Sequence, residues 1–429
     1  MGTWEHQEWT RIADHVPRRE RRTGPYRSYL PDTLVDSAVS LSPHLSRRIA
    51  EAESAVRQLA RRGAHGLASV SRFLLRSEAI ASSRIEGIAP SAKNVALAEL
   101  GQNEDVSGLR DTAILVANNM TAVQTATDTS AAADEFTVEH LIALQRSLLA
   151  DDPRLHGLRD AQNWVGGSQH HPLDAEFVPP APHHVAPLID DLVQYINGAT
   201  HSPIVQAALA HAQFETIHPF ADGNGRVGRA IIHTVLTRRG LTSDTILPVS
   251  LVLATFRDRY IAGLTTYRAE GTSDSPAVIA GREQWIAVFT EAVLAAAERA
   301  TTLADDIEEL RVEWERQLGE HRAGEGRVRA VRSDSAANSV LNSLPGTPAL
   351  TTATVSRIHG VSQQAALKAL ETLREAGILE TASIGRGRRA YLSNELLDLV
   401  TTAERELAST QFDTLPSVPN RPVADRRHA

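Results

Sequence analysis

Apolar residues recur about every 3.6 residues through most of the first 340 residues, and this spacing limits the fold more than any other feature of the chain. Such a period is that of an amphipathic α-helix, which buries one face. In residues 43–62, for example, Leu45, Ile49, Val56 and Leu59 share one helical face. We therefore expect a mainly α protein in which helices pack on one another.

The same pattern predicts further helices along this region. They are expected at residues 73–83, 93–100, 107–127, 137–149, 188–197, 204–214, 223–239 and 279–320. Residues 164–187 break the pattern with two Gly and five Pro, and Phe177 and Val178 there suit a short extended piece. A long loop of this composition inside a compact helical domain is usually functional or disordered.

The pattern changes near residue 334. Two short helices, 353–359 and 363–376, are separated by a turn that contains Gly, and two strands, 377–380 and 389–392, flank a Gly- and Arg-rich turn. Helix, turn, helix and hairpin in this order predict a small α+β winged helix-turn-helix. The last residues hold several Pro and few apolar groups, which indicates a disordered tail.

Composition excludes several kinds of chemistry. The chain has no Cys, so disulfides, Fe–S clusters, thiolate zinc sites and Cys nucleophiles are excluded, and a reducing cytoplasm is the expected location. Its two lysines, Lys93 and Lys368, lack the setting of a P-loop or kinase lysine. No stretch of about 18 apolar residues occurs, so we expect no membrane contact. The net charge of −8 argues against polyanion binding by the whole protein, although a local basic patch is compatible with it.

The segment from His218 to Arg229 carries the densest set of chemical groups in the chain. Gly223, Asn224 and Gly225 stand where a loop becomes a helix. The first N–H groups of a helix lack helical partners, and the helix dipole favours negative charge there. This part of the segment therefore suits the binding of an anion such as phosphate.

The other polar residues of this segment suit the same chemistry. Arg226 and Arg229 are three residues apart and share a helical face, so both can reach one phosphate chain. Asp222 is a hard oxygen ligand, suited to Mg²⁺ that is held jointly with phosphate oxygens. His218 stands at the other end of the loop, where it can act as a general base. Together these groups indicate attack on a nucleotide phosphate.

Three other interpretations of this segment stay open. The run from Gly223 to Gly228 also fits the dinucleotide fingerprint G-x-G-x-x-G, but the residues before it are helical rather than a strand. His218 and Asp222 are also typical ligands of a transition metal, but no clear third ligand stands nearby. The segment is also compatible with a plain loop that caps a helix and leaves its Arg residues in solvent.

The segment His-Pro-Phe-Ala-Asp-Gly-Asn-Gly-Arg-Val-Gly-Arg resembles the Fic family signature, His-x-Phe-x-Asp/Glu-Gly-Asn-Gly-Arg-x-x-Arg, at every fixed position. The flanking sequences 162–167, 177–182 and 214–217 extend the resemblance over roughly residues 29–298. It implies a helical Fic core with a short β flap. It also implies an enzyme that transfers AMP from ATP to a Ser, Thr or Tyr hydroxyl of a protein, itself included, and releases pyrophosphate.

The resemblance assigns a role to each residue of the signature. His218 would deprotonate the target hydroxyl, Asp222 would hold Mg²⁺, and the backbone of Gly223, Asn224 and Gly225 would line the anion hole. Arg226 would grip the phosphates, and Arg229 would bind the γ-phosphate.

The resemblance also assigns roles outside the signature. Glu176, Phe177, Val178 and Pro179 would form a mobile flap that holds the target segment by strand addition, unless they belong to a disordered surface loop. Tyr260 would border the nucleotide base, for which core packing is an equal alternative.

A second pattern, Ser82-Ser-Arg-Ile-Glu86-Gly87, resembles the inhibitory pattern of the family, Ser/Thr-x-x-x-Glu-Gly/Asn. Ser82, Glu86 and Gly87 match its fixed positions. Glu86 would pair with Arg229 and so withhold that guanidinium from the γ-phosphate. Without the motif, a Glu near a helix end is usually a solvated cap.

The role of the C-terminal module stays open between DNA binding and protein binding, because its net positive charge is small. AMP transfer has three alternatives: a nucleotide-sensing DNA-binding regulator, transfer of a different group, and removal of AMP. A homodimer is expected from the resemblance alone.

The expected parts of the chain are a flexible N-terminal segment (1–25), an N-terminal helical region with the inhibitory helix (26–135), the Fic core (136–300), a connecting helix and linker (301–333), the winged helix (334–405) and a disordered tail (406–429).

Overall fold

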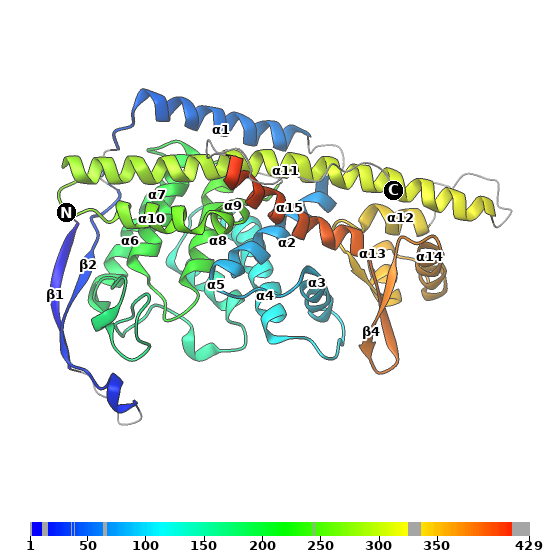
Figure 1. The fold of residues 1–429 in the computed structure, drawn as a ribbon, viewed down its shortest axis with the longest axis horizontal. Coiled ribbons are helices and arrows are strands. Elements are labelled where there is room, and N and C mark those ends of the chain that lie inside the picture. Colours follow the sequence, from blue (N-terminus) through cyan, green and yellow to red (C-terminus); the bar gives the residue numbers. More distant parts are fainter. Residues whose placement is uncertain are drawn as a thin grey trace.

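The computed structural model describes residues 2–10, 16–35, 37, 39–62, 67–242, 245–324 and 336–413. It is built mostly from α-helices, as the periodicity predicts. The longest helix, α11 (Pro276–Gly324), runs along the long axis of the molecule, and α1 (Pro43–Arg62) lies beside it (Figure 1). Helix α1 has the predicted bounds. Arg48 of α1 joins the two helices by donating to both carboxylate oxygens of Glu291, at 2.8 and 2.6 Å.

Two helices at the centre of the molecule flank the motif segment. They are α7 (Pro203–Ile217) and α8 (Asn224–Arg238). Every residue of α7 from Ile204 onward is buried, so this helix lies in the core rather than at its edge. The other helices of this region are α3 (Ala92–Gly101), α4 (Asp111–Thr125), α5 (Val138–Leu148), α6 (Pro182–Asn197), α9 (Val249–Thr255) and α10 (Arg257–Tyr267).

Two of these helices differ from their predicted bounds for local reasons. Helix α6 begins at Pro182 rather than at residue 188, because a proline in the first turn has no helical N–H to lose. Helix α4 begins only at Asp111 and passes into a π-helical turn, Ala126–Ser130. A single π turn inserts an extra residue into a helix without ending it.

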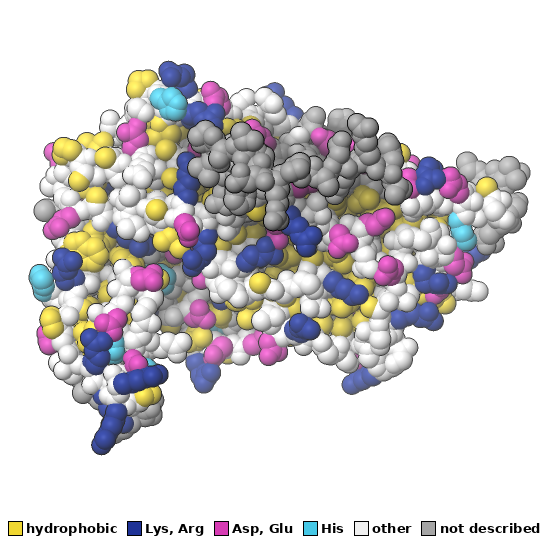
Figure 2. All heavy atoms as spheres, viewed as in Figure 1, with side chains coloured by type: hydrophobic (Ala, Val, Ile, Leu, Met, Phe, Trp, Pro, Cys, Tyr) yellow, Lys and Arg dark blue, Asp and Glu magenta, His cyan; other side chains and the backbone are white. Residues whose placement is uncertain are grey.

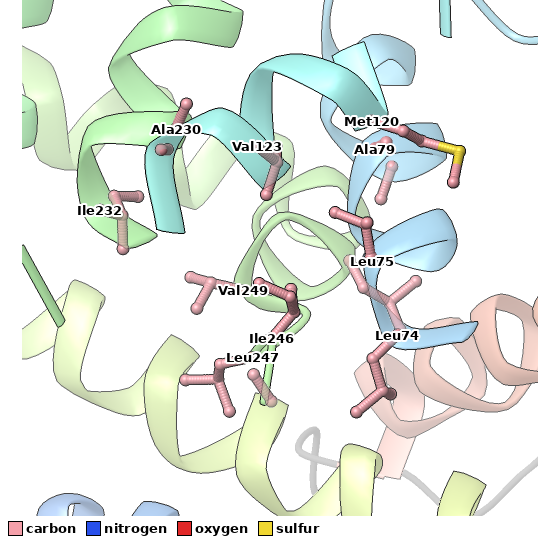
Figure 3. Packing of buried hydrophobic residues seen from close by; sticks show 14 of the residues in the cluster. Leu74, Leu75, Ala79, Met120, Val123, Ala230, Ile232, Ile246, Leu247 and Val249 are labelled. Carbon is pink, nitrogen blue, oxygen red and sulfur yellow. The ribbon is translucent and has the colours of Figure 1, made fainter. Parts of the chain in front are cut away.

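Helix α2 (Leu67–Ile85) carries the inhibitory pattern at its end and lies in the hydrophobic core. Figure 3 shows its Leu74 and Leu75 in one cluster with Val123 of α4 and Val249 of α9. Leu74 and Val249 are 0% exposed. Full burial of a Leu side chain contributes about 1.5–3 kcal/mol to stability. Apolar packing therefore fixes the position of α2.

Polar contacts also hold α2 against the C-terminal part of the chain. Arg76 is 1% exposed and donates to the Glu99 carboxylate at 2.8 Å and to the Gly346 carbonyl at 3.1 Å. Near the C-terminal end of the helix, Arg84 forms an ion pair with Glu404 of α15 (Asn394–Asp413). Helix α2 therefore contacts both the core helices and the C-terminal module.

The N-terminus differs from the prediction of a flexible segment over residues 1–25. Strands β1 (Thr3–Trp9) and β2 (Gly24–Leu30) pair in antiparallel register from Thr3 with Leu30 to Trp9 with Gly24. A short 3₁₀ turn, Arg18–Glu20, lies between them. The hairpin projects from one end of the molecule (Figure 1). That part of the prediction is wrong because long-range contacts, described below, hold the two strands.

The C-terminal module has the predicted order of helices and strands. Strands β4 (Glu380–Gly385) and β5 (Arg388–Leu392) form an antiparallel hairpin, and the short β3 (Ala349–Leu350) pairs with the other edge of β5. Its helices are α12 (Ala336–Ser343), α13 (Thr352–His359) and α14 (Gln363–Glu375). Helix α15 extends to Asp413, so the tail expected from residue 406 begins as helix, while 414–429 lie outside the described residues. Likewise α11 covers the expected linker as far as Gly324, and 325–333 lie outside the described residues.

The turn of the β4–β5 hairpin contacts the connection between α3 and α4. Arg386 pairs with the Asp105 carboxylate at 2.8 Å, and Arg388 with the same carboxylate at 3.4 Å. The Ser107 N–H also donates to the Ile384 carbonyl at 3.0 Å. Over the C-terminal module, at the right of Figure 2, Lys and Arg side chains of the described residues are interspersed with Asp and Glu. In the described part of the chain, no helix combines the length and apolarity needed to cross a bilayer.

Candidate active site

His218 follows the last residue of α7 and has a left-handed backbone conformation, with φ 50° and ψ 58°. A non-glycine residue rarely adopts this conformation, which costs about 1–3 kcal/mol. Burial, and then the positive charges of Arg268 and Arg159, lower the pKa of His218 to about 4. The imidazole is therefore neutral near pH 7, which is the form that accepts a proton.

The loop between His218 and α8 is fixed by Phe220 and Asn224. Phe220 is 0% exposed and contacts Phe214 of α7 with ring centroids 5.8 Å apart, so its ring anchors the loop in the core. The Asn224 side chain accepts from the Phe220 N–H and donates to the Phe220 carbonyl, both at 2.8 Å. Because the Asn224 side chain is used in this way, only its backbone is left to bind an anion.

Gly223 ends the loop with φ 85°, a conformation that favours glycine, and α8 begins at the next residue. Asp222 is exposed, and its Oδ1 accepts from the Gly223 N–H at 2.6 Å. One exposed carboxylate beside a helix N-terminus fits Mg²⁺, which takes one or two protein carboxylates and completes its shell with phosphate oxygens and water. No group of three His, Cys, Asp or Glu side chains suited to a metal occurs among the residues that the structure describes.

The two arginines of the motif differ in their partners. Arg226 is 5% exposed, and its Nε and Nη1 atoms are buried without a hydrogen-bond partner among the described residues. Burial lowers the pKa of Arg226. Arg229 is 2% exposed and donates through Nε to the Ser82 hydroxyl and through Nη2 to the Ser82 carbonyl, both at 2.8 Å. The motif therefore offers one buried cation with free donors and one whose donors are used.

Glu86 approaches the same place from the end of α2. Its Oε1 accepts from Nη2 of Arg229 at 2.8 Å. A Cβ atom built on Gly225 would lie only 2.0 Å from that oxygen, so the carboxylate lies directly against the first turn of α8. Burial by itself would raise the pKa of Glu86, but Arg229 outweighs it, and the pKa lies below its ordinary value. Gly87 follows with φ 78°, and no atom lies within 4 Å of where its Cβ would be.

A second polar contact between α2 and α8 lies two turns earlier on α2 and was missed by sequence reasoning. Glu78 is 0% exposed, and its Oε1 lies 2.9 Å from Nε2 of His233, which is 1% exposed. The same carboxylate accepts from the Ser250 hydroxyl at 2.5 Å and, through Oε2, from the Ser250 N–H at 2.8 Å. Glu78, Ser82 and Glu86 are four residues apart, so they share one face of α2 toward α8.

Tyr260 lies behind Arg229 rather than in the loop. It is 4% exposed, its hydroxyl is 2.9 Å from Nε2 of His211, and its ring contacts Trp285. It also borders a cavity of about 180 Å³ between α9, α10 and α11. These contacts agree with core packing, and a role at the nucleotide base stays a prediction. His211 itself is 0% exposed.

Two further charged residues, Arg268 and Glu215, lie near His218. Arg268 lies over the ring of Phe177 at 3.6 Å from its centroid, and burial lowers its pKa to about 10. Glu215 on α7 is 7% exposed, and its Oε1 has no partner among the described residues. Burial raises the pKa of Glu215 to about 7.

The predicted flap is a bonded structure rather than a free loop. Val165 and Phe177 pair through backbone hydrogen bonds, and Phe177, Val178 and Pro179 are buried while Glu176 is exposed. Strand β2 lies beside it, because the Tyr29 N–H donates to the Val178 carbonyl at 2.9 Å. Further contacts between the N-terminal hairpin and residues 164–184 are Trp9–Trp164, Glu20–Ser168, Glu20–His171, Arg22–Asp174 and Glu5–His184.

The motif segment lies between α7 and α8, and this part of the chain also matches a known family. Residues 135–236 match the model of the Fic/DOC family, and this range contains the whole motif. The chain therefore contains a Fic domain, which confirms the resemblance at that level.

Known proteins agree with this assignment over parts of the chain. Protein adenylyltransferase fic-1 of Caenorhabditis elegans is 30% identical over 140 residues, which cover 32% of this chain and 26% of the relative. A probable protein adenylyltransferase of Aquifex aeolicus is 37% identical over 91 residues, which cover 21% of this chain and 26% of the relative. This chain thus spans about a quarter of the length of these relatives.

The fold itself has a solved counterpart. The crystal structure of a Fic family protein from Desulfovibrio desulfuricans G20 superimposes with a TM-score of 0.50 at 20% identity. The superposition covers 83% of this chain and 98% of that one. The likeness therefore supports the mainly helical fold over most of the chain.

Proposed function

We propose that this chain is a protein adenylyltransferase that uses ATP and Mg²⁺. We also propose that Glu86 restrains its activity. The observation that carries the proposal is the guanidinium of Arg226, which is buried with two donor atoms unpartnered beside the N-terminus of α8. A buried cation without partners costs free energy. A triphosphate in the loop would supply the missing hydrogen-bond acceptors.

The residues of the loop suit transfer of AMP. The neutral imidazole of His218 takes the proton of a target hydroxyl as the hydroxyl oxygen bonds to the α-phosphorus. The bond from the α-phosphorus to the bridging oxygen breaks, and pyrophosphate leaves. The α8 N-terminus and Arg226 stabilise the charge that develops on the phosphate oxygens. Mg²⁺ on Asp222, when bound, supplies further neutralisation of the phosphates. The relatives named protein adenylyltransferase support this choice of reaction.

The contacts of Glu86 support restraint of this reaction. Its carboxylate takes one donor of Arg229 and lies against Gly225, where a phosphate would have to sit. Two like charges close together repel strongly in a buried site. ATP therefore competes with Glu86 for both the cation and the helix N-terminus, and removal of the carboxylate relieves that competition.

The test is incubation of wild type, Glu86→Gly, His218→Ala and the double variant Glu86→Gly/His218→Ala with Mg²⁺ and ATP labelled at the α-phosphate, followed by gel autoradiography. We expect strong protein labelling in Glu86→Gly, weak labelling in wild type and none in Glu86→Gly/His218→Ala. A parallel reaction with γ-labelled ATP should leave the protein unlabelled, because the γ-phosphate leaves with pyrophosphate. Labelling from the γ-phosphate would instead indicate phosphoryl transfer, and no labelling from either would remove the proposal.

A DNA-binding regulator has less support from the contacts of the C-terminal module. In a winged helix the hairpin turn touches the DNA backbone. Here Arg386 and Arg388 of that turn both pair with Asp105. Binding of DNA through the turn would require these pairs to break.

A further inference from the structure

Arg159 is a buried guanidinium outside the motif, and it lies beside the catalytic loop. It is 7% exposed, and no carboxylate among the described residues forms an ion pair with it. Burial without such a partner lowers the pKa of Arg159 to about 10. Holding this charge inside the protein is costly, so its hydrogen bonds must compensate.

All of its side-chain donors point at backbone carbonyls. Nε donates to the His218 carbonyl at 2.9 Å, and Nη2 donates to the Ile217 carbonyl at 3.3 Å. Nη2 also donates to the Pro180 carbonyl at 2.6 Å, at the end of the flap, and Nη1 donates to the Ala161 carbonyl at 3.1 Å. One planar group thus joins the end of α7, the catalytic loop and the flap.

The backbone of residues 158 and 159 also pairs with the loop that follows His218. The Arg159 N–H donates to the Pro219 carbonyl at 2.8 Å, and the preceding Leu158 pairs with Phe220. Asn163 adds a donor to the His218 carbonyl at 3.3 Å and one to the Phe220 carbonyl at 2.9 Å. The residues from 158 to 163 therefore form a hydrogen-bonded support under the catalytic loop.

The left-handed conformation of His218 explains why such a support is needed. The conformation costs about 1–3 kcal/mol and persists only where the surroundings determine it. It also turns the His218 carbonyl away from a helical partner, and Arg159 and Asn163 supply that carbonyl with donors. A hydrogen bond to a charged group contributes about 1.5–3 kcal/mol, enough to offset the strain.

We propose that Arg159 is a positioning residue of the transfer reaction, because its guanidinium holds the His218 backbone in the left-handed conformation and ties the end of the flap to it. The imidazole and the target-binding flap are then kept in one fixed relation. This inference rests on the proposed function, in which His218 is the base and the flap receives the target. The charge of Arg159 also helps to lower the pKa of His218.

The test compares Arg159→Met and Arg159→Lys in the Glu86→Gly protein. Arg154→Met is the matched control, because Arg154 lies in the same connection but is 87% exposed and pairs only with Asp152. We expect kcat for labelling to fall about 100-fold in Arg159→Met while KM for ATP stays within about twofold, since misplacement of about 1 Å costs that much. Lys keeps the charge but lacks the planar fork, so Arg159→Lys should show a similar loss of kcat.

The pKa of His218 gives a readout that does not depend on labelling. Titration of ¹³C-labelled histidines by NMR, with the His218 signal assigned from His218→Ala, should show a higher pKa in Arg159→Met by roughly one unit. Arg159→Lys should leave that pKa near its original value. Unchanged kcat and unchanged His218 titration in both variants would overturn the proposal. Absence of labelling already in the Glu86→Gly parent would count against AMP transfer, while the titration would still decide the role of Arg159.

Folding of the variants is checked separately. Melting temperatures and circular dichroism should stay close to those of the parent in Arg159→Lys, which preserves one donor and the buried charge. Should Arg159→Met fail to fold, Arg159→Lys and Asn163→Ala still test the support of the His218 carbonyl. A merely structural role would lower kcat and the melting temperature in parallel and would leave the rate of proteolytic cleavage in the flap unchanged. That result would contradict the proposal.

Discussion

The Oε1 atom of Glu86 lies 2.8 Å from Nη2 of Arg229 and 2.0 Å from the position that a Cβ on Gly225 would take. One carboxylate therefore contacts both groups that a triphosphate needs, the guanidinium and the first turn of α8. Only a glycine at position 225 leaves room for it. The same absence of a side chain leaves room for a phosphate once the carboxylate has moved.

The pH dependence of labelling should reveal the unusual imidazole of His218. Its pKa of about 4 lies below the ordinary value of 6.5, so the proton-accepting form is lost only as the pH falls through about 4. Initial rates of the Glu86→Gly protein should therefore stay nearly constant from pH 8 down to about 5.5. An ordinary histidine would be about nine-tenths protonated at pH 5.5. A loss of half the rate near pH 6.5, in protein that circular dichroism shows to be folded, would contradict the assignment.

Glu215 should make stability depend on pH in the opposite sense to a salt-bridged carboxylate. Burial raises its pKa to about 7 from 4.5, so the folded state holds a proton that the unfolded state loses. The loss of folding stability that burial of Glu215 causes is absent below about pH 4.5 and grows as the pH rises. It is complete above about pH 7, where it reaches at most about 3 kcal/mol. Glu215→Gln should therefore melt higher than wild type at pH 8 but not at pH 4.5. Exposed Glu270→Gln is the control, and an equal gain at both pH values would rule out this explanation.

Glu78 should help to hold the inhibitory residue in place. Its bonds to His233 and Ser250 fix α2 against α8 and α9, on the face that presents Ser82 and Glu86 to Arg229. The substitution Glu78→Gln should weaken these bonds by about 1–1.5 kcal/mol. In an otherwise wild-type protein, it should therefore raise labelling about 10-fold, which is less than the rise in Glu86→Gly. Ser250→Ala, which removes only the hydroxyl contact, should show a smaller rise. Glu78→Gln should have no effect in the Glu86→Gly background, and an equal fall in both backgrounds would mean that Glu78 only supports the fold.

The two arginines that share Glu99 should differ in their contribution to stability. Arg76 is 1% exposed, whereas the Arg72 side chain is 44% exposed. Loss of a buried partner is costly, while exposed ion pairs contribute little. Arg76→Met should lower the free energy of unfolding by about 3 kcal/mol and Arg72→Met by less than about 1 kcal/mol. Chemical unfolding of the two variants tests this, and equal losses would show that burial does not separate them.

The arrangement of the candidate site residues could be predicted from sequence because these residues are close together in the chain. His218, Asp222, Arg226 and Arg229 lie on one loop and the first turns of one helix, so their order along the chain already fixes their arrangement. Helix α1 could be predicted for a similar reason, because its apolar face and its terminal proline lie within its own residues. The pairing of Glu86 with Arg229 spans 143 residues, and only the family pattern indicated it.

Features that depend on distant contacts were not predicted. The sequence analysis expected a flexible segment over residues 1–25, whereas residues 3–9 and 24–30 form the paired strands β1 and β2. They are held instead by the flap, through Tyr29 with Val178 and Trp9 with Trp164. Glu78 and Arg159 were missed because a buried charge has no signature in a single sequence, and its partners are carbonyls or side chains on other helices.

Helix α2 contacts parts of the chain that lie far away in sequence, both at its middle and near its C-terminal end. Arg84 precedes Glu86 by two residues and pairs with Glu404, and Arg76 bonds to Gly346. A helix is stiff over this length, so a displacement at either contact must move the inhibitory carboxylate with it. If Glu86 restrains ATP binding as proposed, the energy needed to release Arg229 is set partly by a residue that comes 320 positions after Arg84, outside the range that matches the Fic family.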